Sequence, residues 1–130
     1  MKGLFIFRRD LRLDDNLALN KLAEQCDIIY CIFILDDRQI DPRRNKYFSY
    51  ASFLFMLKSI HELQEKIHLT VLSGKSAPHK LISQLVKDLG IELVYASKDY
   101  TKFSLERYSD IKKLTPCYEE LMNHYLNEPT

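Results

Sequence analysis

Eight consecutive residues, Ile28–Leu35, form a run that is apolar throughout. A strand with one face in water alternates apolar and polar residues, so an unbroken apolar run indicates a strand that is covered on both faces. Sheets covered in this way are parallel, and helices connect their strands. The run therefore predicts an α/β fold built around a parallel sheet.

The rest of the chain alternates between the periods of strands and helices. Further strands are expected at residues 4–7, 69–72 and 91–96, and helices at 16–25, 47–66, 77–89, 104–114 and 115–126. Asp14 or Asp15 is expected to cap the first helix, and Gly90 to end the third. The stripe of the 47–66 helix that includes Leu54 and Leu57 is expected to be buried. Right-handed crossovers then predict a three-layer, Rossmann-like sheet of strand order 3-2-1-4, with its switch point between strands one and four.

Bulk composition is that of one ordinary domain. The chain has 130 residues and a net charge of +1, so no broad attraction to nucleic acid or to a membrane surface is expected. No segment approaches the roughly 20 apolar residues of a membrane span, and the start has no signal-peptide layout. The three cysteines have no close pair spacing, which favours reduced thiols and a cytoplasmic location.

Charged residues lie just beyond the ends of the predicted strands. Arg8 and Arg9 follow the first strand, Asp36 the second and Asp99 the fourth. Carboxylates accept ring N–H groups and arginine donates to carbonyl oxygens, so these side chains suit a planar heteroaromatic ligand. Phosphate binding fits less well, because no glycine-rich phosphate loop is present. A hydrolase that uses Asp36 and Asp99, or a salt-bridge network without a ligand, stays open as an alternative, whereas the four histidines show no metal-like clustering.

Several segments resemble the amino-terminal domain of the photolyase/cryptochrome family. They are FRRDLRLDDNLAL (7–19), FILDD (33–37), FLFMLKSIHELQ (53–64), LSGKS (72–76) and VYASKDYTKFSLERYSDIKKL (94–114). The resemblance implies a Rossmann-like lobe that holds a deazaflavin or flavin antenna chromophore through Arg9, Asp36 and Asp99. It also implies that FAD and damaged DNA bind a separate helical domain, where light-dependent repair of pyrimidine dimers takes place. Arg8 and Asp10 are expected to act structurally, with Arg12 or the next helix as partner.

Two departures from the family pattern shape the expectations. Phe103-Ser104 stands where folate-binding relatives have an Asn-Glu pair, so a folate antenna is not expected. The helical reading of residues 115–126 leaves the fifth strand missing, and no helical FAD domain follows. We therefore expect one domain over residues 1–130 that is not catalytic alone. DNA would be reached only through a full-length protein. A small nucleotide-binding domain, and a docking module for a separate helical partner, are the alternatives.

Overall fold

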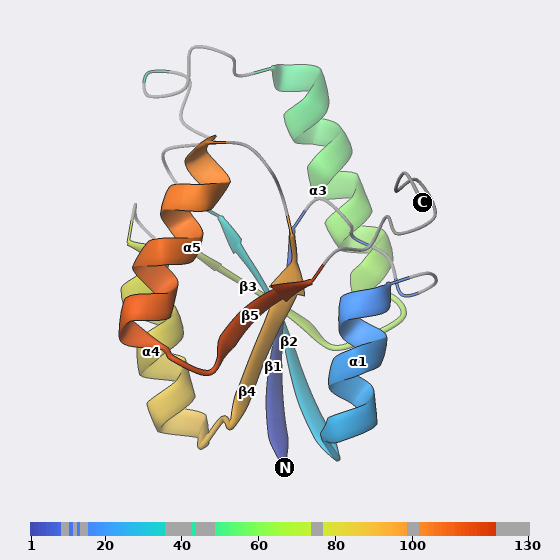
Figure 1. Ribbon diagram of the computed structural model, residues 1–130. Coiled ribbons are helices and arrows are strands. Elements are labelled where there is room, and N and C mark those ends of the chain that lie inside the picture. Colours follow the sequence, from blue (N-terminus) through green and yellow to red (C-terminus); the bar gives the residue numbers. More distant parts are fainter. Residues whose placement is uncertain are drawn as a thin grey trace, which may run out of the picture.

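The computed structural model describes residues 1–8, 11, 13, 16–35, 43, 49–73, 77–98 and 102–121, with residues 102–104 described by their backbone alone. Strands and helices alternate along it (Figure 1). Their bounds are β1 Lys2–Phe7, α1 Leu17–Gln25, β2 Ile28–Leu35, α3 Tyr50–Gln64, β3 Leu69–Ser73, α4 Pro78–Leu89, β4 Leu93–Ser97, α5 Lys102–Leu114 and β5 Tyr118–Leu121.

The sheet is parallel and has the strand order β3-β2-β1-β4-β5. This confirms the predicted order 3-2-1-4 and the α/β class. The predicted absence of a fifth strand is wrong, because Tyr118–Leu121 pairs in parallel with β4 where a helix was expected. Tyr118 is fully buried, and strand alternation places Glu119 on the opposite side of β5 from it.

Two helical layers cover the sheet, as Figure 1 shows, with α1 and α3 on one face and α4 and α5 on the other. Side chains of β1 alternate between these layers, since Phe5 and Phe7 join the core under α1 and α3 whereas Leu4 and Ile6 join the core under α4 and α5. The helix after β1 and the helix after β4 therefore lie on opposite faces. The topological switch point falls between β1 and β4, as predicted.

Local capping explains where the helices begin and end. The side chain of Asn16 accepts a hydrogen bond of 3.1 Å from the Leu19 amide, so Asn16 caps α1, not Asp14 or Asp15 as predicted. Ser49 caps α3 in the same way. Gly90 ends α4 with a left-handed φ of 69°, which confirms the predicted stop.

Helix α3 does not bury the stripe that its sequence predicts. Ile60 and Leu63 lie in the core, but Leu54 is 56% exposed and Leu57 39% exposed. In Figure 1 the first half of α3 extends past the carboxyl ends of the strands, so it has no sheet beneath it to pack against. The expectation that Leu54 and Leu57 are core residues is therefore wrong.

Two further features bear on the class of protein. No helix within the described ranges is long and apolar enough to cross a membrane. Cys26, Cys31 and Cys117 form no disulfide, and burial raises the pKa of Cys31 to about 11. The Cys31 thiol therefore stays protonated at neutral pH.

Candidate functional site at the carboxyl edge of the sheet

Arg8 follows β1 at the carboxyl edge of the sheet, beside the switch point. Its side chain continues the alternation of β1 and takes the same face as Leu4 and Ile6, under α4 and α5. The side chain is only 12% exposed. A guanidinium in such a place requires partners that compensate both its charge and its donors.

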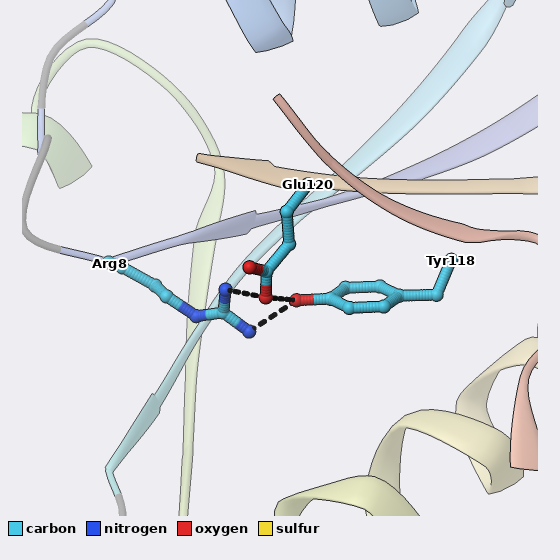
Figure 2. Close-up of polar contacts among 3 residues, drawn as sticks. All are labelled: Arg8, Tyr118 and Glu120. Atoms are coloured by element: carbon cyan, nitrogen blue, oxygen red, sulfur yellow. Dashed lines mark hydrogen bonds and ion pairs between the residues drawn. The ribbon is translucent and has the colours of Figure 1, made fainter. Parts of the chain in front are cut away.

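Tyr118 and Glu120 of β5 supply those partners (Figure 2). Nη1 of Arg8 donates to Oε2 of Glu120 at 2.8 Å, and Nη2 donates to the Tyr118 hydroxyl at 2.6 Å. The Tyr118 hydroxyl in turn donates to the same Glu120 oxygen. We call these three residues the Arg8 triad. The Glu120 side chain is only 4% exposed. The triad is therefore a buried Arg8–Glu120 ion pair to which Tyr118 is hydrogen-bonded on both sides.

The triad joins two strands that are not neighbours. Strand β4 lies between β1 and β5, so the bridge spans two strand spacings, roughly 9.6 Å. Ala96 of β4 pairs with Ile6 on one side and Glu120 on the other. Because the Ala96 side chain is only a methyl group, the Arg8 and Glu120 side chains have room to meet above β4.

Burial and neighbouring charges keep Tyr118 and Arg8 each in one protonation state near neutral pH. Burial raises the pKa of Tyr118 well above its ordinary range, and the Glu120 charge adds to that effect while Arg8 opposes it. Burial alone would lower the pKa of Arg8, but the Tyr118 and Glu120 oxygens outweigh it and the pKa lies above its ordinary value. The hydroxyl therefore stays protonated, and it can donate to Glu120 while it accepts from Arg8.

Arg9, Asp36 and Asp99, the predicted ligand-binding residues, lie outside the described residues. The strands that precede them are described: β1 ends at Phe7, β2 at Leu35 and β4 at Ser97. Since the strands are parallel and adjacent, these three ends share one edge of the sheet. Binding by the three side chains stays a prediction.

The ion pair of Arg8 with Glu120 agrees with the structural role expected of Arg8. Asp10, for which the same role was predicted, and Arg12, an expected partner, lie outside the described residues. Tyr118 and Glu120 were missed because their segment was taken for a helix. The local sequence gave no signal for a strand, because Tyr118, Leu121, Met122 and Tyr125 follow the apolar spacing of a helix. The ring of Tyr108 on α5 packs on Tyr118, with ring centroids 5.7 Å apart.

Two other kinds of ligand site have little support among the described residues. In dinucleotide-binding folds the first helix of the sheet receives phosphate at its amino end. Here the fully buried side chain of Asn16 already takes one of the amide groups at that end of α1. Within the described part of the chain, no group of three or more His, Cys, Asp or Glu side chains could hold a metal ion.

Comparison with known proteins identifies relatives of most of the chain. The family model described as DNA photolyase matches residues 4–129. Cryptochrome DASH of Idiomarina loihiensis is 29% identical over 108 residues, which cover 74% of this chain and 22% of that protein. The deoxyribodipyrimidine photo-lyase of a Synechococcus strain is 30% identical over 109 residues, which cover 80% of this chain and 22% of that protein.

A solved structure extends the similarity to the fold. An archaeal photolyase from Sulfolobus tokodaii, described with two FAD molecules and the implication of a novel light-harvesting cofactor, matches with a TM-score of 0.84 and 32% identity. The match covers 94% of this chain and 29% of that one. The chain thus spans about a fifth of the length of the curated relatives it matches.

Proposed function

The chain belongs to the DNA photolyase family and corresponds to its amino-terminal domain, and we propose that it holds a flavin or deazaflavin antenna chromophore at the carboxyl edge of its sheet. The observation that carries the proposal is that β1, β2 and β4 end at one edge, with the switch point between β1 and β4. Open α/β sheets bind their ligands at this place. The Sulfolobus tokodaii photolyase, with its two FAD molecules, supports a flavin as the ligand class.

The chemistry of the proposed ligands suits the edge of a flavin ring. Arg9 would donate to a ring carbonyl oxygen, and Asp36 and Asp99 would accept hydrogen bonds from ring N–H groups. The Arg8 charge is already compensated by Glu120, so Arg8 is not available as an anion-binding group. The capped amino end of α1 also argues against the nucleotide-binding alternative, in which phosphate would bind there.

Titration of the purified chain with FAD and with 5-deazariboflavin, followed by flavin fluorescence, tests the proposal. Asp99→Asn and Asp36→Asn keep the shape but remove the charge, and each should weaken binding by about 1.5–3 kcal/mol, or roughly 10- to 150-fold. Asp27→Asn is the matched control, since Asp27 is an exposed carboxylate near the amino edge that pairs with the chain's terminal amine. Unchanged affinity in both test variants, or an equal loss in the control, would move the site elsewhere.

We further propose that repair of pyrimidine dimers, FAD chemistry and DNA contact belong to a helical domain outside this sequence. Such a domain could be the remainder of a longer protein or a separate chain. The exposed apolar residues Leu54 and Phe55 of α3 favour a surface that docks it, because large exposed apolar side chains commonly mark interfaces. Three free cysteines support a reducing compartment such as the cytoplasm.

Two assays examine this second proposal. The purified chain should not repair pyrimidine dimers in light, and repair by the chain without any partner would overturn it. The part of the Synechococcus relative that lies outside the matched residues should shift the chain to a larger species in size-exclusion chromatography, and Phe55→Glu should abolish the shift. Glu106→Gln on α5, another exposed helical position, is the control that should leave the shift unchanged.

A further inference from the structure

We infer that Tyr118 and Glu120 are positioning residues for ligand binding at the switch point, and that they act through Arg8. The inference rests on the proposed chromophore site. According to this inference, β5 helps to position the segment that follows β1, although β5 lies two strands away from β1.

Stability alone does not explain why the triad is charged. A buried ion pair loses the hydration of both charges, and apolar residues of the same volume often stabilise a protein equally well or better. Arg8 and Glu120 are nevertheless both almost completely buried. Hydrogen bonds fix the direction of the arginine side chain, whereas apolar packing does not.

The geometry fixes that direction at two atoms. Two different nitrogens of Arg8 are engaged, one by Glu120 and one by Tyr118, and the two acceptors are also bonded to each other. The guanidinium therefore cannot rotate without losing at least one bond. These bonds anchor the Arg8 side chain across β4, at the point where the chain leaves β1.

That anchor matters because Arg9, a proposed ligand residue, is the next residue of the chain. The two residues share a rigid, planar peptide bond, so anchoring Arg8 restricts the position from which the chain continues. Binding sites lose affinity when supporting residues let a ligating group move by about 1 Å. Glu120 would thus control ligand affinity without touching the ligand.

The test compares the full chain with three variants, using FAD as the probe. Glu120→Gln removes the charge at constant shape, and Tyr118→Phe removes one hydroxyl while keeping the ring that packs on Tyr108. Ile82→Val is the control, because Ile82 is fully buried in the same core layer and takes no part in the triad. Each protein is titrated with FAD, the visible circular dichroism of bound FAD is recorded, and amide exchange is measured without ligand over residues 2–8 and 69–73.

We expect Glu120→Gln to raise the Kd for FAD about tenfold, which corresponds to 1.4 kcal/mol, and to alter the circular dichroism of the bound flavin. Tyr118→Phe should change both in the same direction by a smaller factor of about three. Amide exchange should speed up more near Arg8 than in β3, where it reports only the general loss of stability. Ile82→Val should lower the melting temperature but leave the Kd and the spectrum as in the wild type.

The titrations distinguish failure of the proposed function from failure of this inference. A wild-type chain that does not bind FAD overturns the proposed function and this inference with it. Wild-type binding with the same Kd and spectrum in both triad variants overturns the inference alone, as does an equal change in Ile82→Val. If Glu120→Gln fails to fold, Tyr118→Phe decides by the same criteria, since it leaves the Arg8–Glu120 ion pair in place.

Discussion

Replacing Glu120 by glutamine should destabilise the chain strongly even in the absence of any ligand. The Glu120 side chain is 4% exposed and its partner Arg8 is 12% exposed, so the variant leaves a guanidinium charge with little access to water. Removal of one member of a buried ion pair costs about 3–5 kcal/mol. The glutamine oxygen can still accept a hydrogen bond, which returns about 1 kcal/mol. We therefore expect a loss of about 2–4 kcal/mol.

Urea unfolding followed by far-ultraviolet circular dichroism measures this loss. With an m-value of about 2 kcal/mol/M, a 3 kcal/mol loss lowers the midpoint by about 1.5 M. In thermal unfolding the same loss lowers Tm by roughly 10 °C. The triple variant Arg8→Met, Tyr118→Phe, Glu120→Leu should recover most of it, because no buried charge or hydroxyl remains without a partner. A loss of unfolding free energy below about 1 kcal/mol in Glu120→Gln would refute the reasoning, and so would a triple variant that is less stable than Glu120→Gln.

Three further predictions follow from other parts of the fold. Gly3→Ala should cost about 1–3 kcal/mol in urea unfolding, because a Cβ there would lie 2.8 Å from the Cys26 sulfur; a neutral effect would show that α1 can shift away from β1. Leu63→Ala, in the core, should cost about 2–5 kcal/mol whereas exposed Leu54→Ala should stay within about 0.5, and equal losses would contradict the described position of α3. The pKa of Cys31 rises from 9.0 to about 11 on folding, so the unfolded chain releases its proton first and unfolding free energy should fall as pH rises from about 9 to about 11. The loss is at most about 2.7 kcal/mol, and less because the thiol is partly exposed; Cys31→Ala should remove this part of the slope, and identical pH profiles of the two proteins would count against it.

The predictable part of the fold was the part set by local pattern. The apolar run of β2 required cover on both faces, and the structure covers it with helices on both. Handedness of the crossovers then fixed the order of the first four strands. Gly90 could be placed as a helix end because only a residue without a side chain adopts its φ of 69° at little cost.

Helix α3 shows a different limit of pattern reading. Its apolar residues occur on more than one side, and spacing alone cannot say how far the sheet reaches along the helix. Ile60 and Leu63 are buried because sheet lies beneath them, whereas Leu54 is exposed because the helix extends past the strand ends. In a protein with a further domain, such a side chain can be an interface residue, which no local signal separates from a core residue.

Strand β5 could not be recognised from its own residues because its stability depends on a residue 112 positions away. Glu120 facing an apolar layer would cost several kcal/mol without a partner, so a local reading assigns the segment to a solvated helix. Arg8 removes that cost, and it does so only when β1, β4 and β5 are already ordered side by side. Arg8 and Glu120 therefore each explain the burial of the other. An arginine directly after a buried strand is accordingly a reason to search the rest of the chain for a short segment with a buried carboxylate, before such an arginine is assigned to a ligand.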